Sequence, residues 1–377
     1  MRFQYYIIAF FLVLTPMIWA NGGATTLSSR AEISVLTCGP GEELYALYGH
    51  TAIRVSDPLQ GIDRVYNYGL FDFATDNFYM KFIKGDLLYF VDYDNYERFV
   101  RAYIYDDRSV YEQVLQLSPS QKEEIWQKMN LSMEKENREY VYRFVNQNCT
   151  TKVVDLVNDV LETPVVVDVE GNRSTYRSAY SKYQENNYFV NLGINLAFGA
   201  KMDHKSVLLS LPINFMKGLA ETKEQGIPLV SETKIVHEKR MPFTKVWWDT
   251  SWFFSAIMLI WVLGMKNTVI RNAFFFVMGG LGIFFIAIGF YSLHEELLNN
   301  NSVFLCNPLF LLIPFWSSEA YRTKLNLLIS LLLMSLVLFV GLNLKSEKLL
   351  LALPLVLGAL VSLLLLRNAK RVKRVKN

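Results

Sequence analysis

The pattern of hydrophobic and polar positions divides the chain near Trp247. Before that residue, short runs in which apolar and polar residues alternate are interspersed with segments of helical periodicity. Beyond it, long apolar runs follow one another with few charges between them. The mixture of strand and helix patterns predicts an α+β domain before Trp247. The later apolar runs match the thickness of a bilayer, so they predict an all-α transmembrane domain.

Five strands are predicted before the division, at residues 33–38, 51–56, 65–71, 110–117 and 140–144. A helix is predicted over residues 119–136, since Ser118 and Gln121 form the sequence of a capping box before it. A second helix is predicted to begin at Cys149, because apolar residues recur at helical spacing after it. These elements favour a mixed sheet with helices packed on it.

Five transmembrane helices are predicted, at residues 247–265, 273–293, 301–316, 325–342 and 349–366. With Trp247 outside, this number places the more basic loops inside, as the positive-inside rule requires. The third span is short and is interrupted by Asn307, Pro308 and Pro314. A re-entrant loop is therefore the alternative for that segment.

The ends of the chain carry targeting and topology signals. Residues 1–20 combine Arg2, an apolar core and Ala20 before a polar residue, which predicts a secretory signal peptide. An uncleaved anchor is the alternative, and it leaves the next domain on the same side of the membrane. The predicted division is a signal peptide over 1–20, a periplasmic domain over 21–246, a transmembrane domain over 247–366 and a basic cytoplasmic tail over 367–377.

The charge and cysteine content exclude several classes of protein. Lys and Arg total 38 against 35 acidic residues, and six of the basic residues lie within 367–377, which leaves 32 against 35 elsewhere. This balance gives no nucleic-acid footprint. Three cysteines are too few for a disulfide-stapled scaffold. We find no HExxH, P-loop or GxGxxG pattern and expect neither a metal nor another cofactor.

Cys149 lies at the predicted start of a helix, a position that favours a nucleophilic thiolate. Unpaired N–H groups and the positive end of the helix dipole lower the pKa of a thiol there. Asn148 is the expected N-cap, and the Cys149 N–H with the Asn148 or Gln147 side chain could donate to an oxyanion. A buried cysteine on an amphipathic helix is the alternative interpretation.

His50 lies in a predicted strand between small neighbours, where another chain or a substrate can come close. A neutral imidazole could take the proton of the Cys149 thiol and later protonate a leaving group. The following strand offers Asn67 to orient the imidazole, with Asp72 as the second choice. Taken alone, His50 is more often a structural histidine. The histidine precedes the cysteine, the reverse of the papain order, which indicates a circular permutation.

Four motifs together carry a resemblance to a known family. They are Leu36-Thr37-Cys38-Gly39-Pro40-Gly41, Leu47-Tyr48-Gly49-His50-Thr51-Ala52-Ile53-Arg54, Tyr66-Asn67-Tyr68-Gly69-Leu70-Phe71-Asp72-Phe73 and Asn148-Cys149-Thr150-Thr151. With them the chain resembles the Lnb-type lipoprotein N-acyltransferases of Bacteroidetes. The resemblance implies a permuted papain-like domain of the NlpC/P60 superfamily before a multi-span membrane domain. It extends through Thr175-Tyr176-Arg177 to Asn301 and Asn307-Pro308-Leu309.

The resemblance implies a membrane-bound cysteine acyltransferase. Cys149 would take an acyl chain from a phospholipid as a thioester, and the N-terminal amine of a diacylglyceryl-cysteine lipoprotein would then accept it. His50 would act as base and then as acid, on the periplasmic side of the inner (cytoplasmic) membrane. A membrane-anchored cysteine peptidase or peptidoglycan amidase of the same superfamily is the alternative, and a noncatalytic scaffold is a third possibility.

Four further residues are predicted to bind substrate. His294 and Asn301 lie in the loop after the second predicted span, and Asn307 follows just inside the membrane, where polar residues are expensive and often functional. Arg177 could meet a phosphate. The alternative is that these residues belong to ordinary polar turns. Cys306 lacks a helix start or a nearby base and is a poor candidate for the nucleophile.

Overall fold

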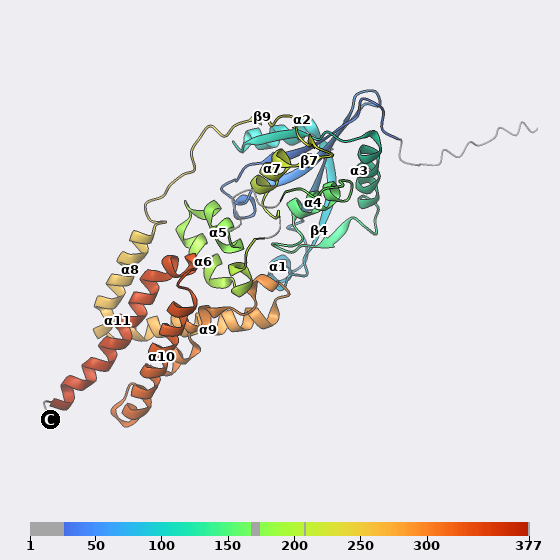
Figure 1. The fold of residues 1–377 in the computed structure, drawn as a ribbon. Coiled ribbons are helices and arrows are strands. Elements are labelled where there is room, and N and C mark those ends of the chain that lie inside the picture. Colours follow the sequence, from blue (N-terminus) through green and yellow to red (C-terminus); the bar gives the residue numbers. More distant parts are fainter. Residues whose placement is uncertain (1–25, 167–173, 207–208, 376–377) are drawn as a thin grey trace, which may run out of the picture.

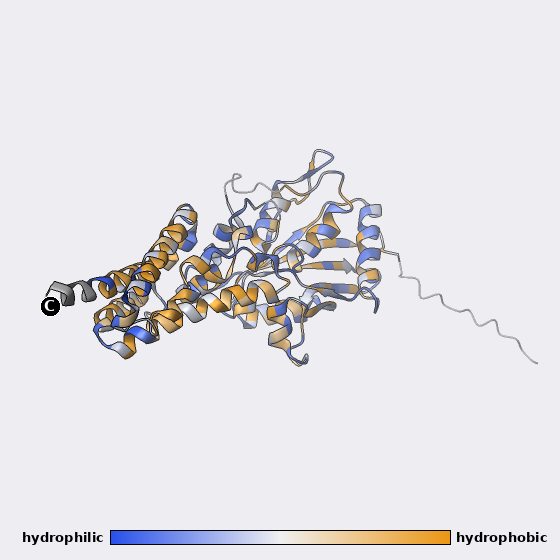
Figure 2. Cartoon of the chain, turned by 90° about the horizontal axis from the view of Figure 1, so that it is seen from below, coloured by the Kyte–Doolittle hydropathy of each residue, from blue (hydrophilic) through white to orange (hydrophobic). Residues whose placement is uncertain are grey.

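A computed structural model shows a sheet domain at one end of the molecule and helices at the other (Figure 1). It describes residues 26–166, 174–206 and 209–375, with side chains described as far as Asn368. The predicted signal peptide, residues 1–20, lies outside the described residues. The helical end is predominantly apolar along its length, whereas the sheet end mixes polar and apolar positions (Figure 2).

The N-terminal part is built on a seven-stranded sheet with the order β6-β4-β3-β2-β1-β5-β9. Its strands are β1 (Glu32–Cys38), β2 (His50–Asp57), β3 (Ile62–Leu70), β4 (Leu88–Asn95), β5 (Val110–Val114), β6 (Glu139–Val141) and β9 (Lys234–His237). The five predicted strands are confirmed, although β5 and β6 end sooner, and the pattern misses β4 and β9. The prediction of a mixed sheet is wrong, because every neighbouring pair of strands is antiparallel.

Helices cover both faces of this sheet. One face carries α3 (Pro119–Ser132), α4 (Cys149–Asn158) and α7 (Pro212–Glu221), and the other carries α2 (Tyr96–Tyr105). The first face buries Ile53 of β2 together with Val153 of α4 and Phe215 of α7. The predicted capping box of Ser118 and Gln121 is present, and α3 ends sooner than expected. The core therefore holds α4 firmly against the strands that carry His50 and Asn67.

Several short elements lie outside the seven-stranded sheet and the helices that cover it. They are α1 (Phe78–Lys84), α5 (Tyr176–Ser181), α6 (Tyr188–Ala197) and the two-stranded pair β7 (Lys223–Glu224) and β8 (Ile227–Pro228). By its packing α6 belongs to the helical end, because Tyr188, Leu192 and Leu196 join the apolar core of the C-terminal helices. The Tyr188 hydroxyl also donates to the carbonyl of Leu351 at 2.7 Å. The sheet domain is thus joined to the helices by side-chain packing as well as by the chain.

The C-terminal part contains α8 (Ser251–Leu263), α9 (Thr268–Tyr291), α10 (Arg322–Leu342) and α11 (Glu347–Val375). Among the described residues, three helical segments are long and apolar enough to cross a membrane: Thr268–Tyr291, Glu319–Leu342 and Glu347–Asn368. The helix α8, at 13 residues, is shorter. The prediction of five transmembrane helices is therefore not confirmed.

The third predicted span is not a helix of membrane length. Residues 301–316 instead form the 3₁₀ turns η6 (Asn301–Phe304) and η7 (Pro308–Leu312). Proline cannot donate the backbone hydrogen bonds that a continuous α-helix requires, and Pro308 and Pro314 interrupt this segment. The segment runs antiparallel to α9, with Cys306 against Gly282 and Leu311 against Gly279. Irregular backbone of this kind is tolerated at membrane depth where neighbouring helices bury it.

Gly282 should be required for this close contact. A Cβ atom added there would lie 2.0 Å from the carbonyl oxygen of Cys306, whereas one added at Gly280 would meet nothing within 4 Å. We expect Gly282→Ala to destabilise the protein by about 1–3 kcal/mol through overpacking. Gly280→Ala, on the same helix, is the matched control and should be nearly neutral. Thermal unfolding in detergent measures both, and equal melting temperatures would contradict the contact.

Candidate active site

Two strand ends and one helix start meet at a single edge of the sheet. Because β2 and β3 are antiparallel, His50 at the start of β2 lies at the same edge as Gly69 near the end of β3. A Cβ atom on Gly69 would lie 3.3 Å from the Cβ atom of Cys149, the first residue of α4. Gly69 also has a φ of 87°, in the region that favours glycine. The absence of a side chain at position 69 thus allows β3 to approach Cys149 closely.

Asn148 holds the start of α4. Its side-chain oxygen accepts from the N–H groups of Thr150 at 2.9 Å and Thr151 at 3.0 Å, which confirms it as the N-cap. Its side-chain nitrogen donates to the carbonyls of Phe144 and Ser210. The Asn148 amide is thus engaged in orienting the helix start. The prediction that the Asn148 side chain binds an oxyanion is not tested by any contact. Because this side-chain nitrogen already donates to two carbonyls, the N–H of Cys149 is the more available donor of the two.

The environment of Cys149 favours its thiolate. Burial raises the pKa of the thiol, but the His50 imidazole, a hydrogen bond from it and the N–H of Thr51 outweigh burial and lower the pKa to about 7. The Thr150 hydroxyl, 3.9 Å from the sulfur, acts in the same direction. Cys38 differs, because burial raises its pKa to about 12. Cys149 is accordingly the more nucleophilic of these two thiols at neutral pH.

Asn67 is the residue that contacts the histidine. The Nε2 atom of His50 lies 3.1 Å from Oδ1 of Asn67, which can only accept a hydrogen bond. With this partner, Nε2 carries the proton in the neutral imidazole and Nδ1 is the nitrogen that can accept one. Asp72 is exposed, and its carboxylate accepts from the N–H of Ala74 at 2.8 Å. Of the two predicted orienting residues, Asn67 has the geometry for this role.

The lowered pKa predicts how fast Cys149 reacts with a soluble alkylating reagent. Because the thiolate is the reactive form, the rate should rise with pH, reach half its maximum near pH 7 and fall about tenfold per unit below that. Iodoacetamide modification, followed by mass spectrometry of the peptide containing Cys149, measures this profile. The peptide containing Cys38 is an internal control and should react far more slowly. A midpoint for Cys149 near pH 9 would refute the coupling to His50.

Two tyrosines that the sequence pattern does not single out lie close to the sulfur. Burial raises the pKa of both Tyr140 and Tyr142 well above the usual value, and negative charge at Cys149 raises each further. Both hydroxyls therefore stay neutral, and their rings give the site an aromatic wall. The alternating tyrosines just before Cys149 were the available signal.

The polar residues predicted in the membrane half have partners within the protein. Nε2 of His294 lies 3.0 Å from the carbonyl oxygen of Phe82. Asn307 caps η7 and donates to the Ser335 hydroxyl at 2.9 Å. Within the described ranges, neither side chain hydrogen-bonds to Cys149, His50 or Asn67. Their roles in substrate binding stay predictions.

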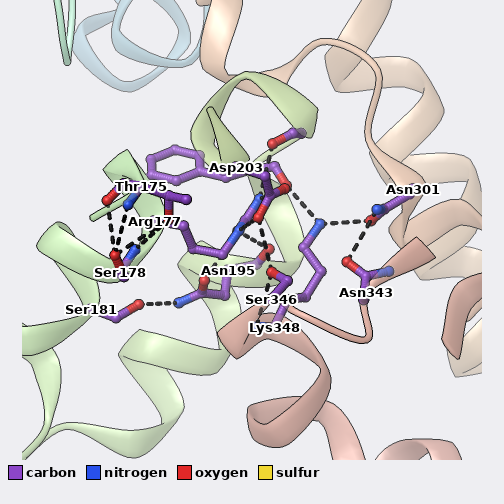
Figure 3. Close-up of polar contacts among 12 residues, drawn as sticks. Thr175, Arg177, Ser178, Ser181, Asn195, Asp203, Asn301, Asn343, Ser346 and Lys348 are labelled. Carbon is purple, nitrogen blue, oxygen red and sulfur yellow. Dashed lines mark hydrogen bonds and ion pairs between the residues drawn. The ribbon is translucent and has the colours of Figure 1, made fainter. Parts of the chain in front are cut away.

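Arg177 lies in a buried polar cluster at the junction between the sheet domain and α11 (Figure 3). The residue is 2% exposed, and its side chain donates to Asp203 at 2.7 Å, to Asn195 and to backbone carbonyls. Lys348, at the start of α11, donates to Asn301 at 2.9 Å in the same cluster. These contacts use the donors of Arg177 inside the protein. The phosphate contact predicted for Arg177 and the substrate-binding role predicted for Asn301 stay predictions, and holding the junction together is what their geometry supports.

Fold and site together define a membrane protein in which a Cys–His–Asn group lies in a sheet domain joined to apolar helices. Residues 24–182 match the family described as the Lnb N-terminal periplasmic domain. The match confirms the resemblance to Lnb-type proteins, and it covers His50, Asn67 and Cys149. The chain is thus a membrane protein with a periplasmic domain. No curated protein and no solved structure matches it significantly.

The described residues contain no group of three or more His, Cys, Asp or Glu side chains placed to hold a metal ion. The three cysteines are free, and Cys38 and Cys149 do not form a disulfide.

Proposed function

We propose that this protein is a cysteine acyltransferase that moves an acyl chain from a phospholipid to the N-terminal amine of diacylglyceryl-cysteine lipoproteins. The observation that carries the proposal is the position of Cys149 at the start of α4, against the strand end at Gly69 and beside the His50–Asn67 pair, where its pKa is lowered. This thiol lies in a domain of the Lnb family that is attached to membrane-capable helices. The phospholipid donor and the lipoprotein acceptor are both held in the membrane by acyl chains, so a site at the membrane surface suits the exchange.

In the first step, the Cys149 sulfur attacks the carbonyl carbon of a phospholipid ester. Its proton passes to Nδ1 of His50, and a carbon–sulfur bond forms. The carbon–oxygen bond of the ester then breaks, and the imidazolium returns its proton to the leaving lysophospholipid oxygen. The N–H of Cys149 at the helix start is available to stabilise the oxyanion between these events.

In the second step, the amine of the lipoprotein attacks the thioester. An amide bond forms, the carbon–sulfur bond breaks, and the proton lost by the nitrogen is taken up by the His50–Cys149 pair. Asn67 acts throughout by accepting from Nε2, so that Nδ1 is the nitrogen left for proton transfer with the sulfur. Splitting the transfer through a thioester replaces one difficult reaction by two easier ones.

The proposal includes five passages through the inner membrane. The passages are α8, α9, residues 301–316, α10 and α11, which alternate in direction. Supporting this, Asn301 donates to Asn343 at 3.1 Å, so the start of the irregular third passage lies beside the end of α10. The basic end of α11 then faces the cytoplasm, in agreement with the positive-inside rule.

Incubation of the full-length protein with vesicles containing acyl-labelled phospholipid tests the function. The expected result is label on Cys149 that hydroxylamine removes and that a diacylglyceryl lipopeptide with a free N-terminus accepts. Cleavage of peptide or peptidoglycan without such a label would assign the site to a hydrolase. If neither activity is detected, the protein would instead have a noncatalytic scaffold role. An N-acetylated lipopeptide is the matched acceptor control, because it has no free amine.

A further inference from the structure

A row of aromatic side chains runs from the neighbourhood of the nucleophile to the surface. We call it the aromatic strip, and it consists of Tyr45, Phe71, Phe73, Phe78, Phe82 and Tyr89. Ring centroids are 4.9 Å apart for Phe71 and Phe73, and again for Phe73 and Phe78. Tyr89 is 6% exposed and Phe73 is 61% exposed, so the strip runs from a buried inner end to an exposed outer end.

The inner end of the strip reaches the surroundings of Cys149. The ring of Phe71 lies 5.3 Å from that of Tyr89, which stacks on Tyr142 at 4.3 Å. Tyr142 is close enough to Cys149 for the thiolate to raise its pKa. Phe71 also follows Gly69, the residue against Cys149, by two positions in the chain. An unbroken apolar path thus leads outward from the site.

The outer end of the strip is fastened to the end of a membrane-capable helix. The last carbonyls of α1 accept from the chain just after α9, which ends at Tyr291 (Figure 1). Ile83 accepts from the Ser292 hydroxyl at 2.7 Å, and Lys84 accepts from the N–H of Leu293 at 2.7 Å. These bonds hold α1 at the C-terminal end of α9. The helix α1 therefore lies at the depth where α9 leaves the apolar interior of the membrane.

The exposed face of α1 has the composition of an interfacial helix. Tyr79, Met80, Phe82 and Ile83 are all exposed, and Tyr79 is 73% exposed. The same helix carries Lys81, whose ammonium group can face lipid phosphates, whereas the ammonium group of Lys84 is paired with Asp86. Four large exposed apolar side chains on one short helix are unfavourable in water and mark a contact surface. Its continuity with α9 identifies lipid as the occupant.

We propose that α1 and the aromatic strip insert into the outer leaflet and guide a phospholipid acyl chain to Cys149. The guiding role rests on the function proposed above, whereas the insertion itself does not. Two experiments therefore examine the two parts separately, both on the full-length protein in phosphatidylethanolamine–phosphatidylglycerol vesicles.

The first experiment measures insertion without any chemistry. In a Cys149→Ala background, Tyr79→Cys is labelled with an environment-sensitive fluorophore, and lipids carrying a nitroxide on the acyl chain are added as quenchers. Leu59→Cys is the matched control, because Leu59 is 60% exposed in the turn between β2 and β3, at the other end of these strands. We expect strong quenching at position 79 and little at position 59.

Equal, weak quenching at both positions would overturn the insertion. Quenching at position 79 should also disappear in detergent that lacks nitroxide. If the fluorophore instead stays shielded there and the protein elutes as a dimer, the strip contacts a second copy of the chain and the lipid assignment is wrong.

The second experiment measures guidance. The triple variant Phe73→Ser, Tyr79→Ser and Phe82→Ser should lower the rate of Cys149 acylation from vesicles by about tenfold or more, since each apolar side chain contributes to lipid contact. Alkylation of Cys149 by iodoacetamide should keep its rate, which shows that the site is intact. Leu59→Ser should leave both rates unchanged. An unaltered acylation rate in the triple variant would overturn guidance, whereas absence of acylation in the wild type would instead refute the proposed function.

Discussion

Replacing Cys149 with alanine should abolish acyl transfer. The sulfur is the atom proposed to carry the acyl chain between donor and acceptor, and alanine offers no nucleophile in its place. The change removes one atom from a partly buried position at the helix start, while Asn148 still caps α4, so the protein should still fold. Label transfer from phospholipid to protein should fall below detection, and lipoproteins should keep a free N-terminus by mass spectrometry.

The other two cysteines supply controls for this result. Cys306 is buried in the core of the C-terminal helices, away from the proposed reaction centre. Cys38 is also buried and lies opposite His50 in the β1–β2 pair, so Cys306→Ala is the cleaner control and Cys38→Ala tests packing beside the site. Both variants should retain acyl transfer to within a few-fold. Triacylated lipoprotein produced by a stably inserted Cys149→Ala protein would remove the cysteine from the mechanism.

Replacing His50 with glutamine should lower the rate of Cys149 acylation by about 10³-fold or more, because two effects combine. Without the imidazole, the lowering effect of His50 on the pKa of Cys149 is lost, while burial still raises that pKa. The pKa should therefore return to its ordinary value of 9.0 or above. At pH 7 the thiolate share would then fall from about one half to about one hundredth. The leaving lysophospholipid would also lose its proton donor.

The pH profile separates these two effects. In the His50→Gln variant, the alkylation midpoint of Cys149 should move from about 7 to 9 or higher, and raising the pH should restore alkylation but only part of the acylation. Asn67→Ala removes the bond that orients the imidazole and leaves the imidazole itself. That variant should fall between the wild type and His50→Gln in rate. Unchanged rate and midpoint in His50→Gln would show that the histidine is structural.

Features that depend on neighbours in the chain were predictable. The start of α4 follows from a capping residue before an apolar helical stripe, and Asn148 caps it as expected. The strand containing His50 follows from alternation over a few residues. The ends of the long apolar helices agree within a few residues, since a long hydrophobic run is hard to place elsewhere than in a helix.

Features that depend on contacts across the fold were not predictable. The prolines of the third span indicate an irregular segment, but only its packing along Gly279 and Gly282 explains how that segment is accommodated. Arg177 looks like a solvated side chain in a polar loop, yet it is buried with Asp203. The docking of α1 on the end of α9 joins residues about two hundred positions apart, which no local pattern encodes.

By itself, the sequence determined that a thiol opens a helix, that a histidine lies in a strand, and that apolar helices follow, because these are local consequences of capping and periodicity. The tertiary structure alone decided that Asn67 and not Asp72 meets His50, and that α1 lies where α9 ends. It did so through antiparallel pairing and buried hydrogen bonds, whose partners are far apart in the chain and are selected only when the whole core packs.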